Sequence, residues 1–148
     1  MRPLAFAMLL LALASAYGAK DETVDELKSR FESARLEDRP ELGIRIAQHQ
    51  LRDADKLYSE GNADLARADV EDIVTYSEKA RDAAIQTKKR LKNVEIDVRK
   101  MAEKLRDVKR TLAFEDQAPV EQAIRRLEDI RTTLLKEMFA KEDKREKK

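Results

Sequence analysis

The sequence predicts an all-α protein: an elongated antiparallel helical bundle or coiled coil built on one helix of about 50 residues, residues 62–114. All three glycines and all three prolines lie outside this stretch, so the residues that most often end helices are missing from it. Small or apolar residues recur within it in alternating steps of four and three. Charged residues make up 41% of the chain and aromatic residues only 5%, which is typical of a thin core with much surface.

The recurring positions form a heptad seam, the pattern of a long helix packed as a coiled coil. Twelve of its fourteen members are apolar, and the other two are small and polar. The members are Ala66, Val70, Ile73, Ser77, Ala80, Ala84, Thr87, Leu91, Val94, Val98, Met101, Leu105, Val108 and Leu112. A continuous helix of about 50 residues would be roughly 75 Å long.

Residues 1–19 have the features of a secretory signal peptide. Arg2 is followed by an apolar run of 11 residues, Leu4 to Ala14, and then by the small-x-small sequence Ala14-Ser15-Ala16. An uncleaved membrane anchor is the alternative, but the run is shorter than the ~20 residues that a spanning helix needs. The absence of cysteine excludes disulfides and lipid attachment through an N-terminal cysteine. We therefore expect a periplasmic or secreted protein.

Two helices are expected before the long one. The first covers about residues 21–37, where Val24, Leu27, Phe31 and Ala34 form one apolar stripe. Pro40 disfavours helix in the residue before it and suits the first turn of a second helix. The stripe of this second helix comprises Ile44, Ala47, Leu51, Ala54 and Tyr58.

A tight connection joins the second helix to the long one. Gly61 is the residue best able to adopt the left-handed conformation that ends a helix, and Asn62 can cap the next helix. The second helix should therefore fold back over about residues 62–82, with the first helix beside them. The small seam residues between 77 and 87 indicate a joint where the long helix exchanges one set of packing partners for another.

A fourth helix begins near Pro119 and should fold back over about residues 90–112. Its stripe consists of Val120, Ile124, Leu127, Leu134 and Met138, widened by Ile130, Leu135 and Phe139. Residues 141–148 contain no apolar side chain and are expected to form a charged, frayed tail. Residues 20–140 then form a single elongated domain of four helices.

Nothing in the sequence predicts an enzyme, a cofactor site or a metal site. His49 is the only histidine, and it lies off the apolar stripe of its helix. Paired carboxylates such as Asp53 and Asp55 are common in a chain this charged, and no glycine-containing calcium loop surrounds them. Met101 and Met138 both fall on apolar stripes, where methionine is ordinary core filling.

The charge balance argues against a nucleic-acid partner. The densest basic run is residues 88–92, but acidic residues are interleaved with the basic ones from Glu95 onward. Without Arg2, the chain has 30 basic and 30 acidic residues, so no net field would attract a polyanion.

The sequence thus favours an exported structural or adaptor protein that acts through contacts between helices and self-associates into a homo-oligomer. Helix four carries more apolar residues than one seam can bury, and surplus apolar surface commonly binds another chain. The predicted interaction seam is Leu91, Val94, Val98, Met101, Leu105, Val108, Leu112, Leu127 and Leu134. The alternative is a periplasmic holdase that binds unfolded proteins between charged helical arms.

Overall fold

The computed structural model describes residues 22–147, and the predicted signal peptide lies outside this range. Within the described range the chain forms five α-helices, one 3₁₀ turn and no strand. The elements are α1 (Val24–Ser33), α2 (Arg39–Ser59), α3 (Ala63–Thr87), α4 (Leu91–Arg110), η1 (Phe114–Asp116) and α5 (Gln117–Glu146). The prediction of an all-α helical bundle is confirmed.

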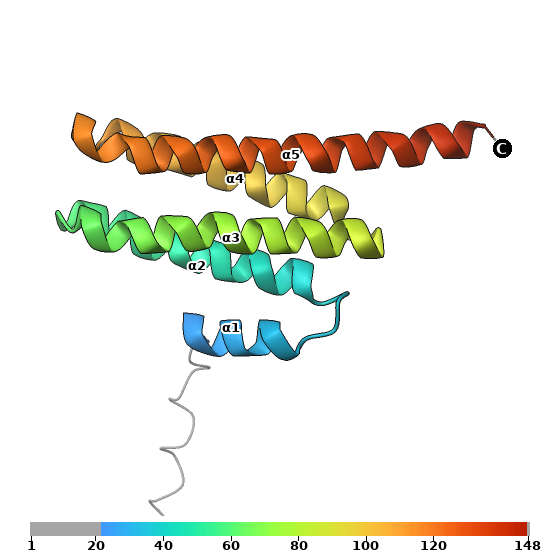
Figure 1. Cartoon of the computed structure of the whole chain (residues 1–148), viewed down its shortest axis with the longest axis horizontal. Helices are drawn as coiled ribbons and strands as arrows, with labels where there is room; N and C mark the ends of the chain where they lie inside the picture. Colours follow the sequence, from blue (N-terminus) through green and yellow to red (C-terminus); the bar gives the residue numbers. More distant parts are fainter. Residues whose placement is uncertain (1–21, 148) are drawn as a thin grey trace, which may run out of the picture.

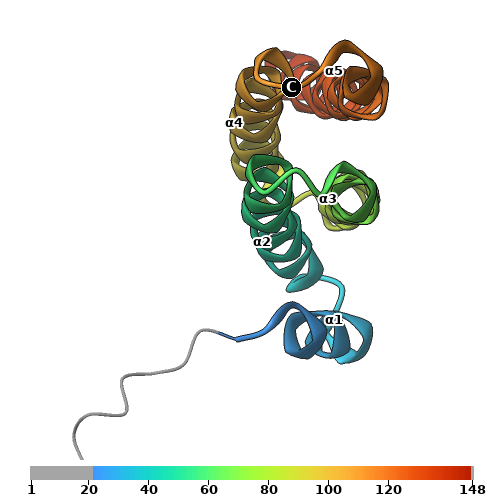
Figure 2. The ribbon, with the colours of Figure 1, turned by 90° about the vertical axis from the view of Figure 1, so that its left-hand side faces the viewer.

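Successive helices run in opposite directions and stack in two layers. Seen end-on, α1, α3 and α5 form one layer, and α2 and α4 form the other (Figure 2). Each helix therefore packs on its neighbour in sequence and on the next helix of its own layer, as α3 does on α5. Viewed from the side, α5 continues beyond the ends of α3 and α4 (Figure 1).

The prediction of one helix over residues 62–114 is wrong, and so is the count of four helices. The chain turns back on itself at residues 88–90, which separate α3 from α4. Lys88 and Arg90 both adopt left-handed backbone conformations, with φ of 55° and 61°. The Thr87 hydroxyl donates to the carbonyl of Ala83 at 2.7 Å and accepts the N–H of Lys89 at 3.4 Å, which helps to close α3 without a glycine.

The seam itself marks buried positions in spite of the break. Twelve of its fourteen side chains are buried, and only Thr87 and Leu112 are partly exposed. Three residues lie between Thr87 and Leu91, so Leu91 comes four positions after Thr87, as at any other seam step of four. The spacing of the pattern therefore continues through the turn. The heptad spacing therefore identified the apolar face of two separate helices.

The first two helices differ from prediction mainly at their ends. α1 is shorter than the helix predicted over residues 21–37. At its start the Thr23 side chain caps the helix by accepting the N–H of Glu26, and at its end the backbone of Ala34 is already extended. Pro40 lies in the first turn of α2, as predicted. Gly61 follows α2 with φ of +79°, the left-handed conformation expected for it. Asn62 precedes α3, but its side chain makes no capping hydrogen bond.

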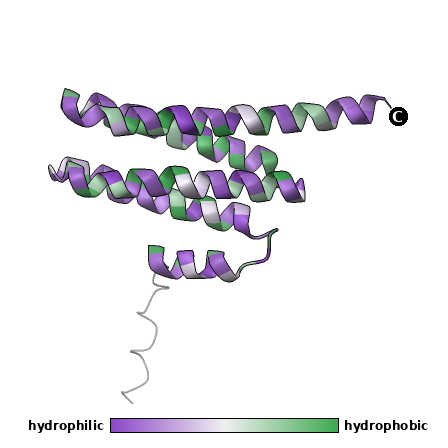
Figure 3. Cartoon of the chain, in the orientation of Figure 1, coloured by the Kyte–Doolittle hydropathy of each residue, from purple (hydrophilic) through white to green (hydrophobic). Residues whose placement is uncertain are grey.

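The core runs the length of the bundle between the two layers. Figure 3 shows apolar and polar residues alternating around each helix, as expected for amphipathic helices packed on one side. Close approach of α2 and α3 depends on Gly43, because a Cβ there would lie 2.9 Å from the Tyr76 carbonyl oxygen and 3.1 Å from the Cβ of Ala80. Phe31 of α1 packs edge-on against the Tyr76 ring and closes this end of the core.

A glycine substitution distinguishes the observed turn from a continuous helix. We expect Lys88→Gly to leave stability unchanged or to raise it by up to ~1 kcal/mol, because glycine adopts positive φ without the cost that lysine bears. Gln86→Gly, two residues earlier and inside α3, should instead lose about 1 kcal/mol. Denaturant unfolding of the two variants measures the difference. Equal losses at the two positions would contradict the turn.

Candidate interaction surfaces

The residues of the predicted interaction seam pack against other helices of the same chain. Eight of its nine residues are buried, and Leu112, near the end of α4, is the one that stays partly exposed. Most of the buried residues of α4, from Leu91 to Leu105, share one apolar cluster with Leu127 and Leu134 of α5, which were expected to face them. Any surface available to another chain must therefore lie on other residues.

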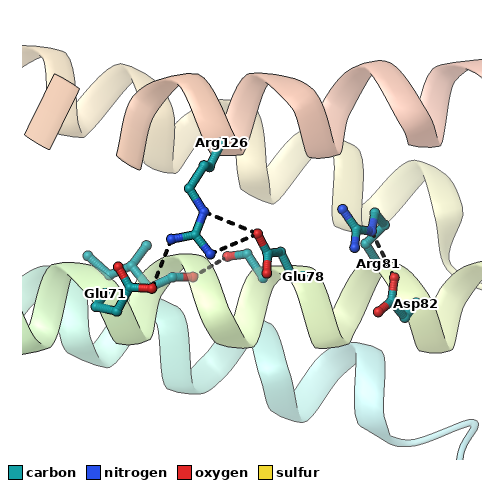
Figure 4. Close-up of polar contacts among 7 residues, drawn as sticks. Glu71, Glu78, Arg81, Asp82 and Arg126 are labelled. Atoms are coloured by element: carbon teal, nitrogen blue, oxygen red, sulfur yellow. Dashed lines mark hydrogen bonds and ion pairs between the residues drawn. The ribbon is translucent and has the colours of Figure 1, made fainter. Parts of the chain in front are cut away.

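Charged side chains join α5 to α3 across one face of the bundle. The Arg126 guanidinium of α5 donates to Glu71 at 2.8 Å and to Glu78 at 3.0 Å, so one cation connects to two carboxylates that lie about two turns apart on α3 (Figure 4). The hydrogen bond to Glu71 raises the pKa of Arg126. A planar guanidinium that contacts two carboxylates fixes the register of the two helices more closely than a single ion pair would.

A second ion-pair network joins α5 to α4. Arg131 donates to Glu95 at 3.1 Å and to Glu128 at 2.9 Å, and Glu128 also accepts from Arg106 at 2.8 Å. Glu95 is only 8% exposed, so Arg131 supplies the charge that makes its burial possible. Partial burial opposes ionisation of Glu128, but the hydrogen bonds from Arg106 and Arg131 outweigh it and lower the pKa of Glu128.

The surface beside this network is concave, and most of its charged side chains already have partners within the chain. An open depression of about 540 Å³ is lined by Arg106, Lys109, Glu121, Ile124, Arg125, Glu128 and Asp129. Lys109 donates to Glu121, and this hydrogen bond lowers the pKa of Glu121. Arg125 lies 3.6 Å from the same carboxylate. Because the lining has three basic and three acidic side chains, and most of them pair with one another, the depression offers little unbalanced charge to a ligand.

Two acidic side chains, Asp72 of α3 and Asp55 of α2, also take part in contacts between helices. Asp72 accepts from Lys28 of α1 at 2.6 Å and from Gln50 of α2 at 2.7 Å, which ties three helices together. Asp55 lies 3.3 Å from Lys104 of α4. Within residues 22–147, no group of three or more histidine, cysteine, aspartate or glutamate side chains could hold a metal ion. His49 is partly exposed on α2, Met101 is buried, and Met138 packs against the core.

The basic run of the sequence falls on the turn between α3 and α4. Lys88, Lys89 and Arg90 are all exposed there. Arg90 lies 3.4 Å from Glu41 of α2, so part of its charge is balanced by a neighbouring helix. The run therefore contributes to a turn at one end of the bundle, where the sequence had predicted the face of a long helix.

Three large apolar side chains are exposed in the part of the chain that the structure describes: Leu65, Phe114 and Phe139. Leu65 lies on α3, and Phe114 lies in the 3₁₀ turn before α5. Phe139 is 62% exposed on α5, five residues after the buried Leu134, and Leu135 and Met138 beside it are only partly buried. This apolar surface is continuous with the core, because Met138 packs against it.

The helix that carries this surface is the longest in the described structure. α5 has 30 residues, compared with 20 in α4 and 25 in α3. It continues through residues 141–146, the segment whose charge density predicts a frayed end. Lys144 and Arg145 lie in its last turn, where positive charge interacts favourably with the helix dipole. We call residues 135–146 the distal segment of α5.

Sequence reasoning missed the ion pairs that position α5. Glu95 follows the seam residue Val94 directly, and Arg131 follows the buried Ile130, so each charge borders an apolar stripe. Charges at such flanking positions commonly pair between helices. That signal alone could not identify the partner of each charge, because the partner depends on which helices lie next to one another.

Comparison with known proteins returned no relative: no family model matches the sequence, and no curated protein or solved structure matches it at a significant level. Among the helices that the structure describes, none combines the length and apolar content needed to cross a bilayer.

Proposed function

We propose that this protein is an exported structural or adaptor protein that binds other protein helices through the distal segment of α5. The observation that carries the proposal is the 62% exposed Phe139 on a helix that continues past its packing partners. An aromatic side chain in water is costly, and exposed apolar surface rimmed by charge is typical of protein interaction sites.

Export is part of the proposal and depends on the features of residues 1–19. An apolar run after Arg2 and the sequence Ala14-Ser15-Ala16 support removal of this segment during secretion. The mature protein would then act in the periplasm or outside the cell.

Site-specific photo-cross-linking in the host tests the binding role. A photoreactive amino acid replaces Phe139 in the distal segment, and in a matched control it replaces Glu103, an exposed residue of α4. We expect one or a few discrete protein adducts at position 139 and none at position 103. Failure to form any protein adduct at position 139 would overturn the proposed function.

The pattern of cross-linked adducts and the behaviour of the purified protein distinguish an adaptor from a holdase. A holdase would form a broad range of adducts with unfolded proteins, and the purified protein would suppress light scattering by an aggregating client. An adaptor should leave that scattering unchanged, because the exposed apolar surface consists of only a few side chains.

A further inference from the structure

We propose that the partner of the distal segment is the distal segment of a second copy, and that the two pair antiparallel with Phe139 at the centre. This inference rests on the proposed function, since it names the occupant of the same surface. It depends on three features of α5: the direction of the Phe139 face, the order of charges along that face, and the length of the segment.

The Phe139 face of α5 points away from the core. At about 100° per residue, Leu127, Ile130 and Leu134 lie roughly 120–180° around the helix from Phe139. All three are fully buried, whereas Phe139 is 62% exposed. A second helix can therefore approach Phe139 from the side opposite these three buried residues.

The charges on this face are ordered so that an antiparallel copy complements them. Leu135, Lys136, Glu142 and Asp143 all lie within about 60° of Phe139 around the helix. Lys136 lies about 4.5 Å before Phe139 along the axis, and Glu142 and Asp143 lie about 4.5 and 6 Å after it. Antiparallel pairing centred on Phe139 brings Lys136 level with Asp143 of the second copy, on the same side of the contact and within about 1.5 Å along the axis. The two-fold symmetry repeats this contact at the other end of the pairing, beyond Phe139.

The opposite orientation lacks this match. A parallel pairing in register would leave Lys136 about 9 Å along the axis from Glu142 of the second copy, the nearest carboxylate on its side of the contact. Lys136 and Asp143 are both exposed within one copy, so both are free to form the contact. Charge order thus selects the antiparallel arrangement, and the pairing is isologous, as most homodimer interfaces are.

The size of the surface predicts a weak dimer. A single face of 12 helical residues falls below the ~1,200 Å² of a standard stable interface, so we expect a transient association with a dissociation constant of about 10 μM to 1 mM. The two phenylalanines and the two leucines supply its apolar centre, and the lysine–carboxylate contacts supply its orientation.

Sedimentation velocity over a concentration series tests the pairing on the chain from residue 20 onward. Phe139→Asp should weaken the dimer by about tenfold or more, because it places two carboxylates at the centre. Phe114→Asp is the matched control: Phe114 is also exposed, but it lies outside the distal segment, so the dimer should not change. Both variants should keep the wild-type melting temperature, which separates lost association from lost folding.

Charge reversal tests the orientation. Lys136→Glu should weaken the dimer several-fold, and adding Asp143→Lys to that variant should restore it. If neither reversal changed the dimer, the antiparallel register would be wrong.

Two results would overturn the inference altogether: a wild-type chain that stays monomeric up to ~1 mM, or a dimer that Phe139→Asp leaves intact. Neither result alone overturns the proposed function, because a discrete cross-link from position 139 to a different protein would still support it. The absence of any cross-link at that position would overturn both.

Discussion

Replacing Val98 with aspartate is expected to unfold the α4–α5 hairpin. Val98 is completely buried in the α4 stripe and belongs to the apolar cluster shared with Leu127 and Leu134 of α5. A carboxylate there would lose its hydration without gaining a partner, and changes of this kind typically cost more than about 3 kcal/mol. The expected result is a large fall in melting temperature, or loss of cooperative unfolding, measured by circular dichroism.

Lys100→Asp provides the matched control on the same helix. Lys100 is exposed, so the same new side chain should change stability by no more than about 0.5 kcal/mol. Equal melting temperatures for the two variants would mean that Val98 is not buried and would contradict the packing of α4 on α5.

The helical class and most of the core could be predicted because both depend on local spacing. A residue such as Ile73 or Leu105 is buried in any arrangement that covers the apolar face of its helix, so the seam identified it without knowledge of the neighbouring helix. The same reasoning placed the turn at Gly61, where the backbone needs positive φ and glycine supplies it.

The turn at residues 88–90 could not be predicted from those rules. Helix ends are usually recognised by glycine or proline, and here Lys88 and Arg90 take the left-handed conformation instead. Tertiary packing compensates for this cost, because folding α4 back lets it pack on both α2 and α5. The gain comes from helices distant in sequence, so a local pattern does not contain it.

The surface was harder to predict than the core for a related reason. Leu127 and Phe139 both extend the apolar stripe of the last helix in the sequence, yet one is fully buried and the other is 62% exposed. Their difference arises from two features: Phe139 lies about 120° around α5 from Leu127, and α5 continues beyond the ends of α3 and α4 (Figure 1). Once α3 and α4 are separate helices, they are too short to cover the whole of α5.

The packing of α2 on α3 should be as sensitive to substitution as the α4–α5 core, because the backbone of α3 occupies the space that a new side chain on α2 would need. At Gly43 an added Cβ would be 2.9 Å from the carbonyl oxygen of Tyr76, and a carbonyl in a helix cannot move aside as a flexible side chain can. The ring of Phe31 lies 3.4 Å away and blocks another direction. Gly43→Val adds two methyl groups beyond that Cβ, so the helices must separate.

We expect Gly43→Val to cost roughly 3 kcal/mol, the upper end of the range for overpacking a core. Gly43→Ala should cost less, because the ~1 kcal/mol gained in helix propensity offsets part of the clash. Arg45→Val, at an exposed position on the same helix, should cost about 0.5 kcal/mol from helix propensity alone and shows the effect of valine where no backbone lies in its way. Urea unfolding of the three variants should rank Gly43→Val as the least stable. If Gly43→Val proved as stable as Arg45→Val, α2 and α3 could not approach as closely as the structure shows.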